Sequence, residues 1–245
     1  MTITEFDKEF DLGYDAGSNG APDINLYEKS VYLTTAEEEI VKAYYSGHEK
    51  TRKGFESSEK RRRTMSELVK SYSQTSSTSS SRGMVNESKF FAIPTNVYYI
   101  VSENVTLSST KDPCVNGKKA LVRPVTNDEF WADYRNPFRK PNKNKAWRLD
   151  LSKDGANPVV EIIASHDISK YEMRYVKAPE PIILTDLTAG EFAGMGLTIN
   201  GQTAPQTCKL NSEIHREILN RAVELAVRDY RENSLKAKIE TNNRV

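Results

Sequence analysis

Side-chain types that act as nucleophiles, bases or metal ligands gather near the C-terminus at Cys208, Glu213, His215 and Glu217. Glu213 and His215 are two positions apart, so on a helix their side chains point about 200° from each other. Glu213 and Glu217 share a helical face, but no second histidine accompanies them at metal-ligand spacing. The spacing therefore assembles no reactive site, and we expect Cys208 and His215 to be packing residues.

Three other segments carry suggestive residues without the pattern that a reaction needs. The glycine-rich segment 189–196 lacks the Lys-Ser/Thr ending of a phosphate-binding loop. His166 and Asp167 are adjacent, so they face opposite sides of a strand, and no nucleophile elbow accompanies them. His48 follows a glycine at a helix end, which is typical of a surface residue. We therefore predict no catalytic residue, no metal and no cofactor, and a protein that is not an enzyme.

The segment from Tyr134 to Arg148 is the best candidate for binding. It contains no acidic residue, and Tyr134, Phe138 and Trp147 are interleaved with its basic residues. The basic residues are Arg135, Arg139, Lys140, Lys143, Lys145 and Arg148. Such a mixture can contact phosphates and stack on bases, so a nucleic-acid-binding module is one interpretation. The other is a partner-protein surface, or a solvated loop anchored by aromatic core residues.

Composition limits the classes of protein that fit. The chain has 245 residues, and 35 Lys and Arg against 34 Asp and Glu leave a net charge of +1. A global field that attracts nucleic acid or an anionic membrane is therefore missing. The sequence contains no apolar run long enough to span a membrane, and its first residues are acidic, so we expect synthesis in the cytoplasm and no membrane partner. Cys114 and Cys208 are expected to be reduced and buried.

The N-terminal region is predicted to be helical. Thr2 and Glu5 have the spacing of a capping box. Apolar residues follow at helical spacing: Ile3, Phe6, Phe10 and Tyr14. Gly13 and Gly17 are expected to end this first helix.

Two more helices are expected before the composition changes. The second is predicted to begin at one of two capping boxes, Thr34 with Glu37 or Thr35 with Glu38, and to end at Gly47. A third is expected from Ser58 to Tyr72. Seven of the eleven residues from Ser71 to Ser81 are serine, which is typical of a flexible linker. We therefore expect a helical segment at 1–70 and a Ser-rich linker at 71–87.

The pattern then changes to that of strands. Short segments rich in β-branched and aromatic residues lie at 89–94, 96–107, 118–125, 146–151, 158–164 and 171–176. Asn-Gly pairs in Val115–Lys118 and Leu197–Gln202 predict two type I′ hairpin turns. The expected structure is an antiparallel β region, a small sandwich or barrel.

The last element is a predicted amphipathic helix from about Ser212 to Lys238. Its apolar stripe consists of Ile214, Ile218, Leu219, Ala222, Leu225 and Ala226. Glu217 with Arg221 and Glu224 with Arg228 have the i,i+4 spacing of ion pairs. We expect this helix to pack on the β region within a domain at 88–245, which gives an α+β fold. Its candidates for assembly contacts are Ile214, His215, Ile218, Leu219, Ala222 and Leu225.

Both ends of the chain resemble a known family. The segments YEMRYVKAPEPIILTDL, LTINGQ and CKLNSEIHREILNRAVELA are similar to the C-terminal part of the collar ring proteins of crAss-like bacteriophages. The segments EFDLGYDAGSNGAPDINLYEKSVYLTTAEEEIV and FESSEKRRRTMSELV resemble the start of the same proteins. The resemblance implies a structural virion protein without catalytic residues.

The resemblance also implies partners. It implies a homo-oligomeric ring, a dodecamer, in the head-to-tail connector between the portal and the tail. Portal protein and adjacent ring or tail proteins would be its neighbours. The genome would pass through its channel during ejection, with transient contact to DNA.

Overall fold

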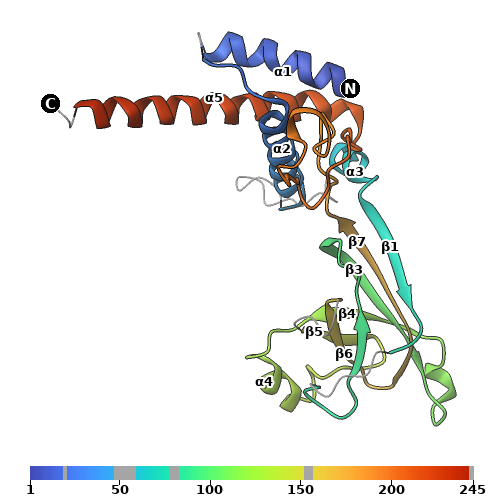
Figure 1. The fold of residues 1–245 in the computed structure, drawn as a ribbon. Helices are drawn as coiled ribbons and strands as arrows, with labels where there is room; N and C mark the ends of the chain where they lie inside the picture. The colour runs from blue at the N-terminus through green and yellow to red at the C-terminus, as the bar shows by residue number, and fades with distance from the viewer. Residues whose placement is uncertain (19–20, 47–58, 78–82, 152–156, 243–245) are drawn as a thin grey trace. The chain divides into compact units, whose positions relative to one another are not determined.

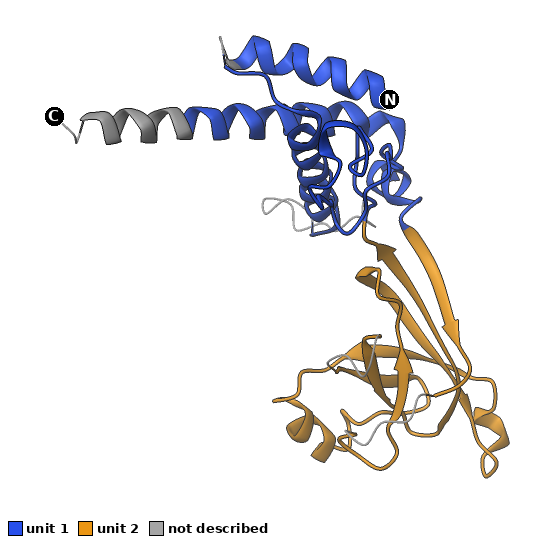
Figure 2. Ribbon diagram, viewed as in Figure 1, with its two compact units in different colours: residues 1–68, 179–245 blue, residues 69–178 orange. Residues whose placement is uncertain are grey.

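The chain divides into two compact units (Figure 2). The structure, a computed structural model, describes residues 1–18, 21–46, 59–77, 83–151 and 157–242, with side chains described as far as residue 232. Unit 1 consists of residues 1–68 and 179–245, and unit 2 consists of residues 69–178. Unit 2 is thus one continuous segment between the two halves of unit 1. The C-terminal helix belongs with the N-terminal helices, and not with the β region as the expected domain at 88–245 had it.

Helix α1 covers Ile3–Ser18 and begins with the predicted capping box (Figure 1). The Glu5 N–H donates to Thr2 Oγ1 at 3.2 Å, and the Thr2 N–H donates to Glu5 Oε2 at 2.8 Å. These bonds satisfy two of the N–H groups that a helix start leaves without partners. The apolar face is buried through Phe6, Phe10 and Tyr14.

Gly13 and Gly17 lie inside α1, so the prediction that they end this helix is wrong. A Cβ at Gly13 would lie 3.1 Å from Val223 Cγ2, and one at Gly17 would lie 3.0 Å from Val227 Cγ2. The two valines have the same four-residue spacing as the two glycines, so α1 runs alongside the C-terminal helix in the same direction (Figure 1). The glycines serve close helix packing, which offsets their low helix propensity.

Helix α2 covers Leu26–Ser46 and starts well before the predicted boxes at Thr34 and Thr35. Its cap is formed by Asn25, whose Oδ1 accepts from the Glu28 N–H at 2.8 Å. Thr34 is buried inside the helix, where its Oγ1 donates to Ile182 O at 3.2 Å and accepts from the Ile182 N–H at 3.1 Å. Thr34 therefore holds the chain segment at Ile182 against α2.

A short helix and a strand replace the third predicted helix. Helix α3 covers Glu59–Met65, and strand β1 covers Val69–Gln74. Strand β1 lies partly in the segment expected to be a Ser-rich linker, and it pairs antiparallel with β7, Asp167–Lys177, along its whole length. Serine is polar and disfavours burial, but an edge strand pairs on one side only and needs few buried side chains. Residues 78–82 of the expected linker lie outside the described residues.

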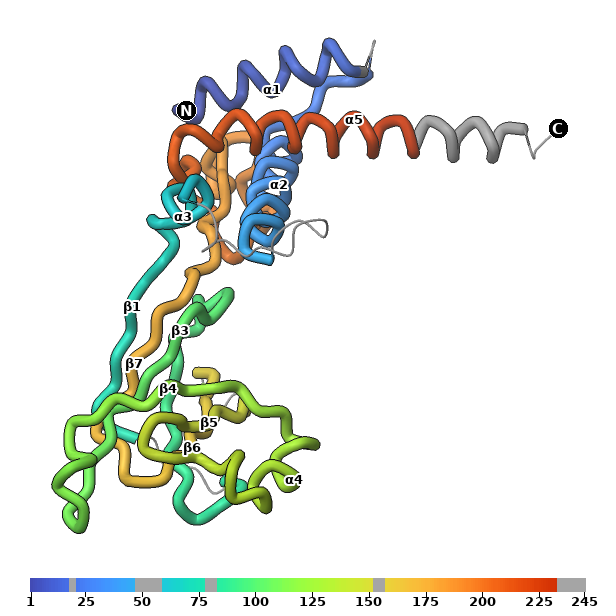
Figure 3. The backbone as a smooth tube through the Cα atoms, turned by 180° about the vertical axis from the view of Figure 1, so that it is seen from behind, coloured from blue at the N-terminus to red at the C-terminus, as the bar shows by residue number. Residues whose placement is uncertain are grey.

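Helix α5 covers Ser212–Asn242 and carries the predicted buried stripe. All six stripe residues from Ile214 to Ala226 are buried. In Figures 1 and 3, α2 crosses α5 while α1 lies along it, and both contact it. The charged side chains pair differently from the prediction, because Arg221 contacts Glu39 of α2 at 2.8 Å and Glu224 at 2.8 Å.

Unit 2 is built on one seven-stranded sheet that curls into a half-barrel (Figure 3). The strand order is β1-β7-β3-β4-β5-β6-β2. The strands not yet given are β2 Lys89–Ala92, β3 Val97–Ser108, β4 Lys119–Pro124, β5 Lys145–Asp150 and β6 Val159–Ile163. All the predicted strands are present. The pairing is antiparallel except between β4 and β5, which are parallel, so the sheet is mixed.

The two Asn-Gly turns differ from each other. At Asn200 and Gly201 the φ values are 50° and 77°, and Ile199 and Gln202 exchange both backbone hydrogen bonds at 2.9 Å, as in a type I′ hairpin. Asn116, however, has φ −61° and ψ 124°, and only Gly117 has a positive φ, 76°. This second turn is therefore type II, and the type I′ prediction is wrong there.

Candidate assembly surface

An aromatic cluster in unit 2 supports the segment that the sequence selects for binding. Helix α4 covers Phe130–Arg135, and Phe130 is fully buried in a cluster with Trp147, Leu149 and Ile163. The ring of Tyr134 lies 5.4 Å from that of Phe130 and 6.5 Å from that of Trp147. Alternating strand residues of β5 and the helix thus build a rigid aromatic base.

Two large apolar side chains project from this base into solvent. Trp131 is 48% exposed, and Phe138 is 95% exposed. The turn that carries Phe138 is fixed by Asn136, whose Oδ1 accepts from the Phe138 N–H at 3.0 Å and whose carbonyl oxygen accepts from the Arg139 N–H at 3.1 Å. We call α4 and the turn after it, residues 130–140, the tip. Trp131 lies outside the segment that the sequence selects, although it is three residues before Tyr134, one turn away on the same helix.

The six predicted basic residues do not act as one surface. Arg139 pairs with Asp133 at 2.6 Å, and Lys143 pairs with Asp112 at 2.7 Å. Lys140 lies 4.9 Å from the centre of the Tyr134 ring, and Lys145 lies 5.8 Å from that of Trp147. Arg135 is exposed, and no ion pair with it is found within the described part of the chain.

Arg148, the sixth, is a core residue and not a surface contact. Its Nη1 lies 2.5 Å from Glu103 Oε2, and only 11% of the Arg148 side chain and 4% of the Glu103 side chain are exposed. The Tyr171 hydroxyl also donates to Glu103. Burial raises the pKa of Glu103, although Tyr171 and Arg148 oppose that shift. This polar cluster lies inside unit 2 and cannot take part in an outer contact.

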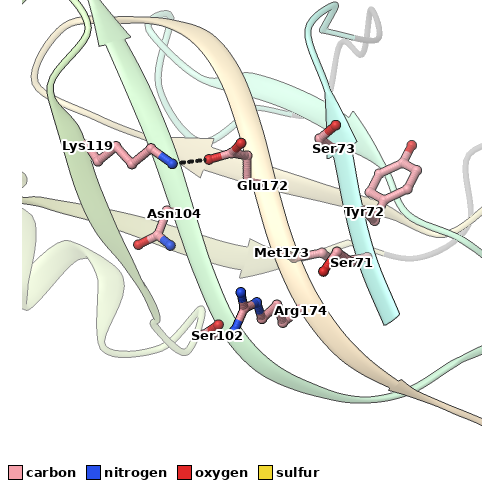
Figure 4. A pocket seen from close by; sticks show the side chains of 9 residues that line it. All are labelled: Ser71, Tyr72, Ser73, Ser102, Asn104, Lys119, Glu172, Met173 and Arg174. Carbon is pink, nitrogen blue, oxygen red and sulfur yellow. Dashed lines mark hydrogen bonds and ion pairs between the residues drawn. The ribbon is translucent and has the colours of Figure 1, made fainter. Parts of the chain in front are cut away.

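The polar face of the β1-β7-β3 ribbon carries an open hollow of about 450 Å³ (Figure 4). The strand register places Arg174 of β7 opposite Ser71 of β1 on one side and Ser102 of β3 on the other. Glu172 lies two residues before Arg174, on the same face of β7. Lys119 Nζ lies 2.6 Å from Glu172, and hydrogen bonds from Lys119 and Lys170 lower the Glu172 pKa to about 2. The lining is mostly polar, with Met173 and one aromatic residue, Tyr72, which packs against the buried core of the sheet.

The residues of reactive type near the C-terminus are held inside unit 1. The Cys208 thiol is buried and donates to Glu37 Oε1 at 3.2 Å, and burial raises its pKa. His215 is 6% exposed; its Nε2–H donates to Leu210 O at 2.9 Å, and its Nδ1 accepts from the Met1 ammonium at 2.6 Å. Burial lowers the pKa of His215. Both residues pack within the unit, as the sequence predicts.

The glutamates beside them point elsewhere. Glu217 accepts from the Tyr44 hydroxyl at 2.7 Å and lies 3.6 Å from Lys60 Nζ, while Glu213 is exposed. In unit 2, Cys114 is exposed, so the prediction that it is buried is wrong; it lies in a short 3₁₀ turn at the surface. His166 contacts Ser165 Oγ at 2.9 Å, and His48 lies outside the described residues.

The predicted assembly residues of α5 are all buried in unit 1. These are Ile214, His215, Ile218, Leu219, Ala222 and Leu225. Each is at most 6% exposed, so this stripe packs the core of its own subunit. Any contact between copies through α5 must use its other face, where Asn220, Glu224 and Arg228 line a hollow of about 470 Å³.

Among the residues that the structure describes, no group of three His, Cys, Asp or Glu side chains is placed to hold a metal ion. Within the same residues, no helix combines the length and the apolar character needed to cross a membrane.

Comparison with known proteins covers both units. Residues 1–238 match the family described as phage tail ring protein 3/4. Ring protein 3 of Bacteroides phage crAss001 is 38% identical over 226 residues, which are 90% of this chain and 94% of that protein. Ring protein 4/5 of the same phage is 36% identical over 249 residues, which cover 100% of this chain and 99% of that protein. The similarity extends over the helical unit and the sheet unit alike.

Proposed function

Since the chain belongs to the phage tail ring protein 3/4 family, and is thus a structural ring protein of a phage virion, we propose that it forms a homo-oligomeric ring in the head-to-tail connector. The full-length match to two ring proteins carries this proposal, and it agrees with the resemblance that both ends of the sequence show. In the connector, the ring joins the portal side of the particle to the tail and surrounds the channel through which the genome passes.

The role we propose is structural and involves no catalysis. The polar atoms of Cys208 and His215 are engaged in contacts inside unit 1, which supports packing roles for both. Unit 2, in contrast, exposes the aromatic side chains of Trp131 and Phe138 on a rigid base. Large exposed aromatic side chains are enriched at protein interfaces, so the tip suits contacts within an assembly.

The stoichiometry and the neighbours are part of the proposal. We expect twelve copies, with portal protein or an adjacent ring or tail protein above and below. Mass photometry of the purified full chain, followed by two-dimensional class averages, tests this directly. The expected result is a closed ring of uniform copy number with a central channel. A chain that stays monomeric at high concentration, and that also fails to bind portal or neighbouring ring protein, would contradict it.

A nucleic-acid-binding module is the alternative function, and it rests on the basic segment 134–148. Because Arg139, Lys143 and Arg148 are paired with carboxylates, only Arg135, Lys140 and Lys145 are left to meet phosphates. We therefore expect at most weak, transient contact with DNA in the channel. Titration with duplex DNA at rising salt distinguishes the two: a dedicated binder loses affinity with a slope of about 0.9 per phosphate contacted.

A further inference from the structure

Charge is distributed very unevenly along this nearly neutral chain. Residues 1–40 contain ten acidic and two basic residues, whereas residues 134–148 contain six basic residues and no acidic one. The first segment belongs to unit 1, and the second belongs to unit 2. A chain of net charge +1 therefore carries an acidic segment in one unit and a basic segment in the other.

The acidic segment has an exposed apolar residue of its own. Leu12 on α1 is 72% exposed, and its neighbour Asp15 is exposed as well. Asp11 pairs with Lys29 at 2.7 Å, yet half of its side chain remains exposed. Asp7 contacts the same lysine, so one cation serves two carboxylates, and the exposed Lys8, one turn before Leu12, offsets only part of the negative charge of Glu5, Asp11 and Asp15. We call this outer side of α1, centred on Leu12, the acidic face.

The tip is complementary to the acidic face in both chemistry and charge. It presents Phe138 and Trp131 as apolar side chains, with Arg135 exposed between them along the chain. Its Phe138 turn is held by hydrogen bonds to Asn136, so little ordering entropy would be lost on contact. An aromatic anchor with arginine beside it is the composition typical of the centre of an interface.

We propose that the tip of one copy docks on the acidic face of the next copy, with Phe138 packed beside Leu12. This deepens the proposed function and rests on it, because a closed ring built from head-to-tail contacts needs two different, mutually complementary surfaces on every subunit. The opposite charges select this pairing and disfavour tip-to-tip and face-to-face contacts.

Duplex DNA is a less suitable occupant of the tip. Arg139 and Lys143 already have carboxylate partners within 2.7 Å, which DNA phosphates would have to displace. The most exposed side chain of the tip is an apolar ring, Phe138, and phosphate contacts give it no role. An acidic protein surface with its own exposed leucine satisfies both features.

Single substitutions on each surface test the contact by sedimentation velocity and mass photometry of the full chain. Phe138→Ser and Leu12→Ser remove exposed side chains, so neither should unfold its unit, which circular dichroism verifies. Each is expected to weaken self-association by roughly tenfold or more. Met195→Ser, which removes a 62% exposed side chain outside both surfaces, is the matched control and should assemble as the wild type does.

Mixing and charge reversal make the test directional. Phe138→Ser chains retain the acidic face and Leu12→Ser chains retain the tip, so an equimolar mixture should form dimers that neither variant forms alone and should not form closed rings. Arg135→Glu or Asp15→Lys should each weaken assembly, and the two together in one chain should restore part of it. Arg123→Glu reverses an exposed charge on β4 and should change nothing.

The outcomes separate this contact from the proposed ring itself. If the wild type forms rings and all four surface variants form them equally well, the contact is wrong and the ring function stands. If the wild type stays monomeric up to millimolar concentration, the contact is wrong and the ring proposal loses its support from the isolated chain. If Arg135→Glu abolishes salt-sensitive binding to duplex DNA while Phe138→Ser leaves assembly intact, the tip is a DNA contact instead.

Discussion

Two buried glutamates, Glu37 in unit 1 and Glu103 in unit 2, are held in different ways. In unit 1, Glu37 is 1% exposed, its nearest hydrogen-bond donor is the neutral Cys208 thiol, and its Oε2 has no partner among the described residues. In unit 2, Glu103 is buried as well, but Arg148 and Tyr171 both contact it. Glu37 is thus a buried carboxyl without a cationic partner, so its effect on the free energy of unfolding depends on pH. Glu103 belongs to a buried ion pair, so a loss of stability appears only when one partner is removed.

The units also differ in the large apolar side chains that they expose: unit 1 exposes the aliphatic Leu12, Val31 and Met195, whereas unit 2 exposes the aromatic Trp131 and Phe138 together with Leu121. The six stripe residues of α5 are all used within unit 1, and two glycines of α1 bring the helices close together. Unit 2 buries one side of its sheet and its aromatic cluster but leaves Phe138 and Trp131 outside. We infer that unit 1 supplies a firmly packed helical body, and that unit 2 supplies the aromatic side chains of an assembly contact.

The largest expected effect comes from breaking the buried pair of unit 2. Arg148→Met leaves Glu103 buried without its cation, which typically costs about 3–5 kcal/mol. Denaturant unfolding followed by tryptophan fluorescence measures this well, because Trp147 and Trp131 both lie in unit 2. Arg148→Met combined with Glu103→Gln should recover a large part of the loss. Equal stability of Arg148→Met and wild type would show that the pair does not hold the sheet.

The next effect concerns the pH dependence of unit 1. Burial raises the pKa of Glu37 to about 7, from an ordinary value of 4.5. Stability from the neutral carboxyl is therefore fully present below about pH 4.5 and is lost as pH rises through 7, a loss of about 3 kcal/mol. Glu37→Gln should remove this dependence and be more stable than the wild type at pH 8. Unfolding curves followed by helical circular dichroism between pH 4.5 and 8 measure it.

A second group in unit 1, His215, changes stability with pH in the opposite direction, so the measurement needs a control for it. Burial lowers the pKa of His215 below 6.5, so its contribution is present above that pH and is lost as pH falls. The difference between wild type and Glu37→Gln at each pH cancels this contribution. A difference that is flat across the range would contradict the role given to Glu37.

The close contact between α1 and α5 gives a smaller effect. Gly17→Leu places a side chain where a Cβ alone would lie 3.0 Å from Val227 Cγ2, and overpacking of this kind costs about 1–3 kcal/mol. Ala16→Leu puts the same side chain on an exposed position of the same helix and should be nearly neutral. Thermal unfolding of both variants provides the comparison, and equal melting temperatures would show that the helices are not packed through the glycine.

The smallest expected effect is at the exposed ion pairs of unit 2. Arg139→Met removes the partner of Asp133 at the tip, where 65% of the Arg139 side chain and 22% of the Asp133 side chain are exposed, and we expect little change in the unfolding midpoint. The contrast with Arg148→Met sharpens the distinction between the two arginines, which the sequence presents as equivalent. A loss as large as that of Arg148→Met would mean that the tip is part of the core.

The sequence predicts correctly those elements whose pattern depends on residues that are close together in the sequence. The capping box of Thr2 and Glu5, the stripe of α5 and the alternating strands from Lys89 onward are of this kind. The elements that it misses depend on a distant partner. Gly13 and Gly17 are helical because Val223 and Val227 pack against them, and β1 is ordered because β7 pairs with it.

The candidate site shows the same limit. Six basic residues and three aromatic ones define the predicted binding segment 134–148, of which residues 134–140 belong to the tip. Arg148 is not part of the exposed surface, because Glu103, 45 positions away, pairs with it in the core. Trp131 and Leu12 are exposed, which no local pattern in the sequence reveals. The acidic and basic segments are visible in the sequence, but their separation onto two units is not.

A reconstruction of the intact virion tests the central claim most directly. We expect density for this chain as a closed ring at the neck, between portal and tail, with residues 130–140 of each copy against α1 of the next. The chain found elsewhere in the particle, or outside it, would contradict the connector function. A neck ring in which Phe138 points into the channel or into solvent would keep that function and reject the contact between tip and acidic face.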